Sequence, residues 1–340
     1  MKILFIGFGT VGQGLAGLLV RKKKWLVDEC GLDVRVVGIS DKLKGSLLAP
    51  DGLDLQAVLD GVEAGKSLHD LGGERFEGNA VDMIDQAEAD VMVEVTYTDI
   101  RTAEPATSHI RRAFERGMHV VTTNKGPVAL YYRELSDIAR QKGVEFLFEG
   151  TVMSGTPLLN LIRENLAGCE IQEISGILNG TTNYILTRME DGLSYEEALK
   201  KAQELGYAEA VPDADVLGWD ALAKVCILAK VVFGATGKPF DYPCEGITDI
   251  TPAAIAEAKA RDKRFKLIGR VWREGHYVKA SVGPEEVDML HPLASVMGAT
   301  NAVTITTDAL GDVTIVGPGA GKEATGFSLF VDLISLGGSR

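Results

Sequence analysis

A helix-length segment, residues 218–234 (GWDALAKVCILAKVVFG), places two charged side chains among apolar ones. Asp220 and Lys224 are four residues apart, so a helix brings both onto one face. The other positions are apolar nearly all round, which is typical of a buried helix, where ionised groups need a partner or a purpose. The two residues form either a self-balancing ion pair or a site in which the carboxylate binds a substrate ammonium. In the second case the lysine, whose pKa burial lowers, transfers a proton.

Two more carboxylates lie just upstream, in residues 205–218, a loop that glycine and proline interrupt. Glu209 and Asp215 thereby join Asp220 and Lys224 at one loop–helix junction. Three carboxylates and one lysine suit a small zwitterion, because the carboxylates attract its amino group. A related question concerns residues 176–189 (GILNGTTNYILTRM), where glycine, threonine and asparagine interrupt an apolar run. Threonine and asparagine are good helix N-caps, which is the simplest explanation of that interruption.

A glycine pattern near the N-terminus predicts a second kind of site. Gly7, Gly9 and Gly12 form GxGxxG directly after an apolar run and before a helical one. The first glycine permits a tight turn, the second lets a pyrophosphate approach the backbone, and the third lets helix and strand pack closely. The helix N-terminus then offers free N–H groups to the phosphates. The alternative is a merely tight βα turn, but the position after the first strand favours a dinucleotide site.

The cofactor type is left open by the end of the next predicted strand, residues 34–39. Asp41 would hold a ribose 2′-hydroxyl and favour NAD, whereas Lys42 and Lys44 would favour NADP. All three could equally form a solvated turn. Thr96 and Lys125 follow two later strands, residues 91–95 and 119–122, and therefore belong to the edge where such sheets bind ligands. For Lys125 an ordinary surface loop is the alternative.

The elements that must position these residues change character near residue 150. Predicted strands at 2–6, 34–39, 91–95, 119–122 and 144–149 alternate with helical segments, which indicates a Rossmann-type doubly wound parallel sheet. Later residues predict helices at 157–166, 195–205 and 219–233, with strands at 171–178, 265–271, 277–282 and 300–306. Ser194 and Glu197 form a capping box before the second of these helices. We expect an α/β dinucleotide-binding domain, residues 1–148, and an α+β catalytic and dimerisation region with a mixed sheet, residues 149–318. A C-terminal helical segment, residues 319–340, is expected to pack back on the first domain.

Composition excludes several other classes of protein. The 340 residues carry a net charge of −13, which disfavours a nucleic-acid partner. No apolar run is long enough to span a membrane, and the start reads as a strand rather than a signal peptide. The four cysteines are scattered without a CxxC pair, which favours reduced thiols and a cytoplasmic protein.

Several long motifs resemble the homoserine dehydrogenase family. They are residues 176–189, 202–225 (AQELGYAEAVPDADVLGWDALAKV), 120–129 (VVTTNKGPVA), 149–157 (EGTVMSGTP), 291–303 (HPLASVMGATNAV) and 317–321 (GPGAG). The resemblance runs in order from residue 1 to about 335. It implies reversible NAD(P)H-dependent reduction of L-aspartate 4-semialdehyde to L-homoserine, in threonine, methionine and isoleucine biosynthesis.

The resemblance also implies roles for individual residues. Lys224 would be the acid/base, with Asp220, Asp215 and Lys125 as further catalytic residues. Substrate binding would involve Glu209, Asp220, Gly180, Thr181, Thr182, Asn183 and Tyr207, with the 176–189 segment lying beside substrate and nicotinamide. Cofactor binding would involve Gly7, Phe8, Gly9, Thr10, Val11, Gly12, Ser40, Asp41, Lys42, Thr96, Lys125 and Gly321. A sodium-like ion would bind main-chain oxygens of Glu149, Val152, Ser154 and Thr156, and two copies would pair as a homodimer.

The chain departs from the family pattern at two places. Val211 stands where the family usually has an acidic residue, although Asp213 is close. The sequence stops at Arg340, so we expect no C-terminal module that binds threonine.

Two rival functions are a thioester-forming aldehyde dehydrogenase and a non-catalytic NAD(P)-binding sensor. The first would need Cys226 as nucleophile, whereas a buried, inert thiol suits that apolar helix better. The second has no use for Asp220 and Lys224.

Overall fold

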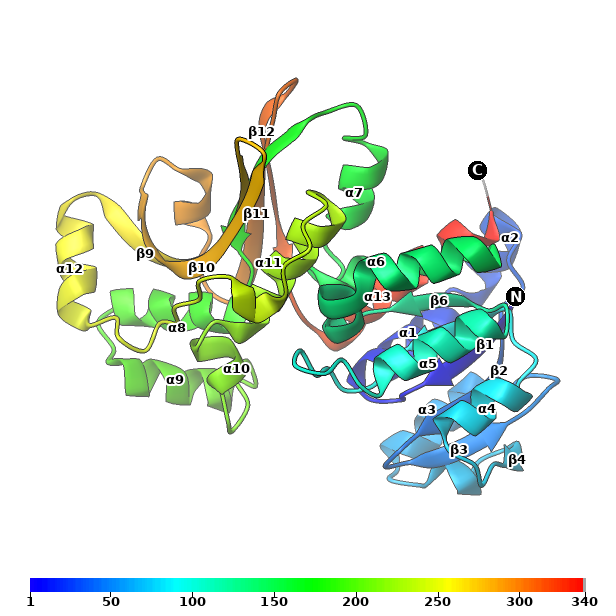
Figure 1. Ribbon diagram of the computed structural model, residues 1–340. Helices are drawn as coiled ribbons and strands as arrows, with labels where there is room; N and C mark the ends of the chain where they lie inside the picture. The colour runs from blue at the N-terminus through cyan, green and yellow to red at the C-terminus, as the bar shows by residue number, and fades with distance from the viewer. Residues whose placement is uncertain (339–340) are drawn as a thin grey trace. The chain divides into compact units, whose positions relative to one another are not determined.

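The computed structural model describes residues 1–338, in two compact units that are coloured along the chain in Figure 1. The first unit contains residues 1–155 and the segment that begins at Gly321, and the second contains residues 156–320. Residues 339–340, the end of the predicted C-terminal segment 319–340, lie outside the described part. No helix within residues 1–338 is both long and apolar enough to cross a membrane.

The first unit is built on a seven-stranded sheet in the order β4-β3-β2-β1-β5-β6-β7. The strands β2, β1, β5, β6 and β7 pair in parallel, whereas β3 and β4 are antiparallel additions at one edge. The doubly wound prediction is therefore confirmed. The strands are β1 (Lys2–Ile6), β2 (Arg35–Asp41), β3 (Gly45–Leu48), β4 (Glu74–Arg75), β5 (Val91–Glu94), β6 (His119–Thr122) and β7 (Phe146–Leu147).

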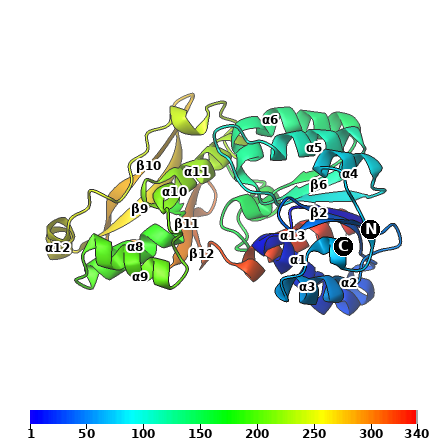
Figure 2. The same cartoon turned by 90° about the horizontal axis from the view of Figure 1, so that it is seen from below.

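Helices cover both faces of this sheet. Figure 2 shows α4 to α6 on one face and α1, α2, α3 and α13 on the other. The helices are α1 (Thr10–Arg21), α2 (Lys23–Cys30), α3 (Leu55–Glu63), α4 (Ala80–Gln86), α5 (Ala106–Glu115), α6 (Lys125–Lys142) and α13 (Lys322–Gly337). Asparagine caps fix two of their starts, since Asn79 and Asn124 accept hydrogen bonds from amides of the first turn of α4 and α6.

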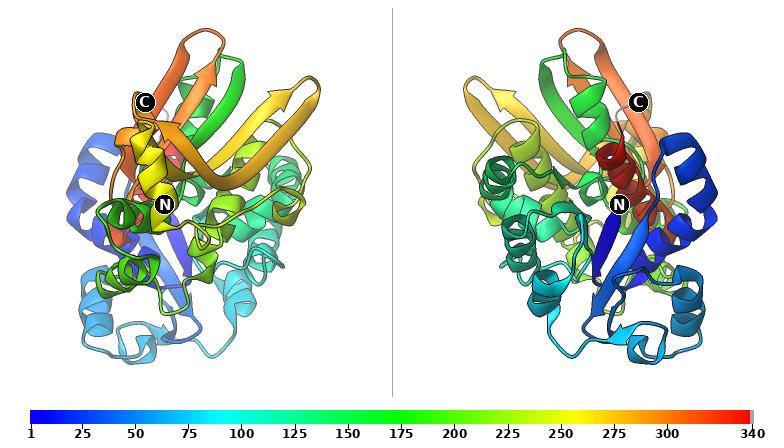
Figure 3. Two further views of the ribbon diagram at one scale, coloured as in Figure 1. Left: turned by 90° about the vertical axis from the view of Figure 1, so that its left-hand side faces the viewer. Right: turned by 90° about the vertical axis from the view of Figure 1, so that its right-hand side faces the viewer.

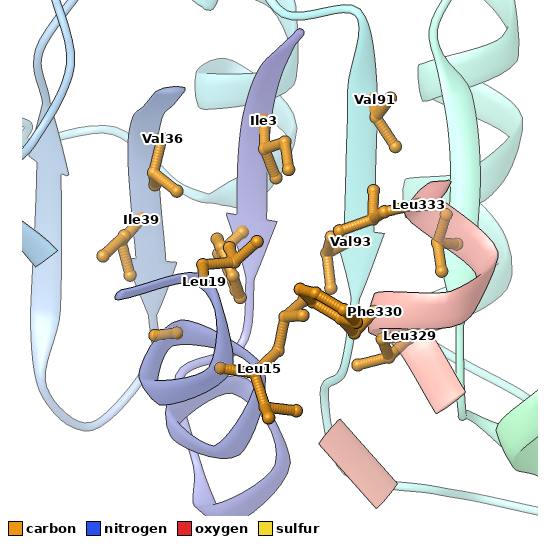
Figure 4. Packing of buried hydrophobic residues seen from close by; sticks show 14 of the residues in the cluster. Ile3, Leu15, Leu19, Val36, Ile39, Val91, Val93, Leu329, Phe330 and Leu333 are labelled. Atoms are coloured by element: carbon orange, nitrogen blue, oxygen red, sulfur yellow. The ribbon is translucent and has the colours of Figure 1, made fainter. Parts of the chain in front are cut away.

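The C-terminal helix α13 packs beside α1. Gly14 and Gly326 meet there backbone to backbone, because a Cβ on Gly326 would lie 2.6 Å from the main chain of Gly14. Leu329, Phe330 and Leu333 then reach the core with Leu15 and Leu19 of α1, against Ile3, Val36, Ile39, Val91 and Val93 of the sheet (Figure 4). Full burial of one such side chain stabilises the fold by about 1.5–3 kcal/mol.

The second unit contains a five-stranded sheet in the order β10-β9-β8-β11-β12 (Figure 3). All of its strand pairs are antiparallel, which corrects the mixed sheet that we expected. Hairpins and antiparallel returns connect these strands, so no parallel crossover is needed. The strands are β8 (Ile171–Ile177), β9 (Lys263–Glu274), β10 (Tyr277–Asp288), β11 (Thr300–Thr307) and β12 (Gly311–Pro318). The helices are α7 (Leu159–Glu164), α8 (Gly180–Glu190), α9 (Tyr195–Glu204), α10 (Asp213–Val216), α11 (Trp219–Val231) and α12 (Pro252–Ala260).

Several predicted boundaries change for physical reasons. The expected strand at 144–149 shrinks to Phe146–Leu147, and Glu149 starts a 3₁₀ turn instead. Strands β9 and β10 are longer than expected. Charged residues in their added ends pair across the two strands, Lys263 with Glu286 and Glu274 with Lys279. The capping box at Ser194 and Glu197 forms as predicted.

Candidate active site

The glycine loop of the first unit has the features of a phosphate-binding turn. Gly7 has φ +95°, and a Cβ there would lie 2.5 Å from the carbonyl oxygen of Val95. Gly9 has no heavy atom within 4 Å of its Cβ position, so the approach to its backbone is open. A Cβ on Gly12 would lie 3.0 Å from the Gly7 carbonyl oxygen, which explains the close packing of helix and strand. Each glycine thus fits the task that the pattern predicts.

Helix α1 starts at Thr10 and has no side-chain cap at Gly9. The amides of its first turn, which include Thr10 and Val11, therefore remain available to an anion. The Phe8 amide is engaged, because it donates to Asp41 Oδ2 at 2.8 Å. These residues consequently fit the pyrophosphate of a dinucleotide.

Asp41 is held rigidly at the end of β2. Its second oxygen, Oδ1, accepts from the amides of Leu43 at 2.9 Å and Lys44 at 3.0 Å. The Lys44 ammonium lies 3.9 Å from the same oxygen, whereas Lys42 is exposed. Ser40 lies on the same strand, and its main-chain oxygen accepts from the Gly7 amide. The end of β2 therefore carries a fixed carboxylate beside the glycine loop.

Three other predicted cofactor residues surround the same sheet edge. Thr96 follows β5, and its main-chain oxygen accepts from Asn124 Nδ2 at 3.3 Å. Lys125 is the first residue of α6, directly after its cap Asn124. Gly321 has φ +132° and precedes α13, whose Lys322 Nζ lies 3.5 Å from Gln13 of α1. The first unit therefore gathers segments that are distant in sequence around the glycine loop.

In the second unit, the asparagine that caps α8 joins two carboxylates. Asn179 Nδ2 donates to Asp215 Oδ1 at 2.7 Å and to Asp220 Oδ2 at 2.9 Å. Its Oδ1 accepts from the Thr182 amide at 2.9 Å, as an N-cap does. The interruption of the apolar run at 176–189 is thereby explained, since one side chain both starts the helix and organises the acidic cluster.

Lys224 completes this cluster. Its Nζ donates to Asp220 Oδ2 at 2.7 Å and to the Leu178 carbonyl at 2.6 Å. Only 6% of Lys224 is exposed. The structure therefore contains the ion pair that helical spacing predicts, within reach of a second carboxylate on Asp215.

The like charges affect Asp215. Burial, followed by repulsion from Asp220, raises the pKa of the Asp215 carboxyl above its ordinary value, and the hydrogen bond from Asn179 and the charge of Lys224 oppose this shift. A cation that binds beside these two carboxylates would relieve the repulsion. The cluster is therefore electrostatically suited to a ligand with a positive charge.

The remaining predicted substrate residues divide into two groups. Thr181 Oγ1 donates to the Tyr207 carbonyl at 2.6 Å, which holds the 205–218 loop against α8. Gly180 is needed at its position, because a Cβ would lie 2.6 Å from the Ala299 carbonyl oxygen. Glu209 is exposed, and within residues 1–338 its side chain makes no recorded hydrogen bond to the Asn179 cluster. Glu209 therefore stands apart from the cluster that it was expected to join.

The side chain of Asn183 is hydrogen-bonded within the protein at both its amide nitrogen and its amide oxygen. Its Nδ2 donates to the carbonyls of Val296, Gly298 and Thr300, and its Oδ1 accepts from Lys266. Its side-chain hydrogen bonds are made within the protein, and substrate binding by Asn183 stays a prediction.

Three structural features near the predicted sites were missed from the sequence. The first is Asn179, which joins Asp215 to Asp220 over a separation of about forty residues in the sequence. Asn301 is wholly buried, and within residues 1–338 neither polar atom of its side chain has a hydrogen-bond partner. It lies against Gly180 and Gly319. Unpaired buried amides are uncommon, and a water or ligand group usually satisfies them. The third feature is the pair of Glu94 and His109. Its only sequence signal is weak, namely an acidic residue at the end of the apolar strand β5.

The predicted cation residues lie in the loop after β7 and at the start of the second unit. Met153 and Ser154 have φ values of +63° and +55°, and Ser154 Oγ lies 2.7 Å from Thr325 Oγ1. Val152 N donates to the Glu149 carbonyl over a long 3.5 Å. Thr156 Oγ1 donates to the Pro318 carbonyl at 3.0 Å.

The fold and these clusters define an α/β oxidoreductase that binds a nicotinamide dinucleotide. The family model of the homoserine dehydrogenase NAD-binding domain matches residues 7–149, and that of homoserine dehydrogenase matches residues 157–334. The chain belongs to the homoserine dehydrogenase family and is an NAD(P)-dependent oxidoreductase of amino-acid biosynthesis. The family and enzyme class predicted from the motifs are thereby confirmed.

Individual relatives agree along the whole chain. The NAD(+)-dependent homoserine dehydrogenase of Pseudomonas canavaninivorans is 42% identical over 336 residues, which cover 98% of this chain and 96% of the relative. A putative homoserine dehydrogenase from Archaeoglobus fulgidus has a TM-score of 0.89 and 38% identity, with 100% of both chains covered. A hyperthermophilic archaeal homoserine dehydrogenase in complex with NADPH has a TM-score of 0.85 and 31% identity, covering 100% of this chain and 98% of that one.

Proposed function

We propose that the Asn179 cluster is the substrate and proton-transfer site for reversible reduction of L-aspartate 4-semialdehyde to L-homoserine. The observation that carries the proposal is the buried Lys224 ammonium, 2.7 Å from Asp220 Oδ2 and next to a second carboxylate that Asn179 holds. A bound nicotinamide supplies or accepts the hydride. Lys224 Nζ gives a proton to the aldehyde oxygen during reduction and removes it during oxidation.

The carboxylates would bind the amino group of the substrate. Asp215 and Asp220 repel each other, so a substrate ammonium between their oxygens lowers the free energy of the cluster. Thr181, Thr182 and Gly180 begin α8, whose N-terminus favours a carboxylate. Glu209 and Tyr207 belong to the adjoining loop, and we propose that Glu209 reaches the ammonium only when that loop closes.

Homoserine-dependent reduction of NAD and of NADP, measured side by side, tests this reaction directly. We expect turnover with homoserine and none with the same concentration of L-threonine or n-butanol, which lack either the primary hydroxyl or the amino-acid head. Equal rates with all three alcohols would contradict the assignment of the carboxylate cluster.

We infer that NAD is preferred over NADP. Three backbone amides hold the Asp41 carboxylate in place, so it cannot rotate away from a 2′-phosphate. The P. canavaninivorans relative is named as NAD(+)-dependent, whereas the archaeal structure contains NADPH. A higher kcat/KM with NAD is the expected result, and a clear preference for NADP would show that Lys42 and Lys44 outweigh Asp41.

Two further proposals come from the family. The consecutive left-handed residues Met153 and Ser154 support a backbone cation site, because strained turns often clamp ligands. Replacing sodium by tetramethylammonium should then lower thermal stability. Pairing of two copies is supported by the edge strand β12, where Val316 is 54% exposed. Light scattering should give a dimer mass, and a monomer at micromolar concentration would contradict it.

A further inference from the structure

A buried carboxylate stands at the end of β5, and the proposed reaction does not use it. Glu94 is 0% exposed. Its Oε1 accepts from the Thr96 amide at 3.3 Å and also from the Thr96 hydroxyl in a short hydrogen bond. Its Oε2 lies 3.5 Å from Thr122 Oγ1. Two donors from one residue therefore converge on a carboxylate that water does not reach.

One histidine stands behind this carboxylate. His109 of α5 is 5% exposed, and its Nδ1 lies 3.5 Å from Glu94 Oε1. Among the ion pairs recorded for residues 1–338, His109 is the only basic group beside Glu94. A buried carboxylate is costly unless donors or an opposite charge compensate it. Thr96 supplies such donors to Glu94, and His109 lies beside them.

The position of Glu94 in the sheet suggests its role. Strand β1 has β2 on one side and β5 on the other, so the direction in which strands are added changes between β1 and β5. Ligands of such sheets bind beyond the carboxyl ends of the strands at this switch point. Glu94 is the last residue of β5, and the following turn touches the glycine loop, since a Cβ on Gly7 would lie 2.9 Å from the Thr96 amide nitrogen.

The hydrogen bond to Glu94 decides what Thr96 can offer a ligand. Because the Thr96 hydroxyl donates its proton to Glu94, its remaining lone pairs can only accept. Asn124 Nδ2 donates to the carbonyls of Thr96 and Tyr97 and so holds the same turn from the β6 side. The turn is thus fixed from both sides, with an acceptor at its centre.

The half of the dinucleotide that meets this acceptor follows from the sheet. Each half of a doubly wound sheet binds one mononucleotide. Asp41 at the end of β2 belongs to the adenosine half, so the ends of β5 and β6 belong to the nicotinamide half. That half carries suitable donors, namely ribose hydroxyls and the carboxamide N–H groups.

We propose that Glu94, supported by His109, is a positioning residue for the nicotinamide half of the cofactor. It orients the Thr96 hydroxyl as an acceptor and fixes the turn against Gly7. The inference rests on the proposed function only in taking a nicotinamide dinucleotide as the ligand.

Binding measurements on Glu94→Gln test this inference. The glutamine keeps the shape of the side chain, but it replaces one acceptor oxygen by an amide donor that competes for the Thr96 oxygen. We expect the Kd for NADH or NADPH, whichever the parent binds more tightly, to rise roughly tenfold. The Kd for ADP, which lacks the nicotinamide half, should stay unchanged. Equal losses for both ligands, or no loss for either, would overturn the proposal.

A second variant separates positioning from general damage. Thr96→Val should weaken dinucleotide binding to a similar extent, and the double variant should bind no worse than Thr96→Val alone, because Glu94 acts through Thr96. Additive losses would mean that Glu94 acts by another route. Glu88→Gln, at an exposed position of the same unit, is the matched control. Since no homoserine is present, a failure of the proposed reaction would leave this test intact.

Discussion

Two lysines in the second unit are both buried, but their partners differ. Lys224 donates to the Asp220 carboxylate and to one carbonyl. Lys266, only 1% exposed, donates to Asn183 Oδ1 at 2.8 Å and to the Val296 carbonyl in a short hydrogen bond. The first lysine therefore faces a charge, whereas the second faces neutral acceptors.

The difference shows when a buried lysine indicates chemistry. Burial, followed by repulsion from Arg264, lowers the pKa of Lys266 to about 8. Glu190 opposes this shift, but it also pairs with Arg264 at 2.6 Å. Through Asn183, Lys266 ties β9 to α8 and to residues 296–300, which is a structural role. Lys224 has a carboxylate partner and a second carboxylate nearby, and only this arrangement suits a zwitterionic substrate.

The largest expected effect distinguishes the two lysines by activity. Lys224→Ala should lower kcat by about 10²–10⁴-fold, as is typical when a general acid/base is removed. Steady-state kinetics with homoserine measure it, and Lys230→Ala on the same helix is the control. Unchanged turnover would remove Lys224 from the mechanism and require a different acid/base.

The second prediction concerns the effect of Lys266 on the pH dependence of the unfolding free energy. The folded protein releases this proton near pH 8, whereas the unfolded chain keeps it to about 10.5, so stability rises with pH across that window. Relative to Lys266→Met, the unfolding free energy of the parent should rise by about 3 kcal/mol between these pH values. Urea unfolding at each pH measures the difference, and a pH-independent difference would show that Lys266 is charged throughout.

The third prediction separates binding from proton transfer. Asp220→Ala removes one acceptor from Lys224 and from Asn179, and we expect the KM for homoserine to rise about 10–100-fold. The Kd for the dinucleotide should not change, because Asp220 belongs to the second unit. Equal loss of affinity for both ligands would contradict its role in substrate binding.

The smallest expected effect is on stability at Asp215. Its raised pKa means that the protonated form favours folding at acid pH and that this contribution is lost as pH rises through the folded pKa. Asp215→Asn should therefore raise the melting temperature by a few degrees at neutral pH and by nothing at acid pH, while it weakens homoserine binding. Thermal unfolding at both pH values measures this, and a lower melting temperature at neutral pH would count against repulsion within the cluster.

Much of the fold could be predicted because its signals are local. The box at Ser194 and Glu197 and the helical spacing of Asp220 and Lys224 depend on residues within one turn of each other. Pairings between residues far apart in the sequence were harder to predict. The ends of β9 and β10 were underestimated, because charged residues such as Lys263 and Glu286 remain in a strand only when the neighbouring strand supplies a partner.

The sequence by itself determined the family, the glycine loop and the composition of helix α11, because these depend on residue types at fixed short spacings. Only the tertiary structure decided that Asn179 joins Asp215 to Asp220, that Lys266 donates a hydrogen bond to Asn183, and that Glu94 lies beside His109. Each of these contacts joins residues that are 15 or more positions apart, and strand register and helix packing alone bring such side chains within bonding distance.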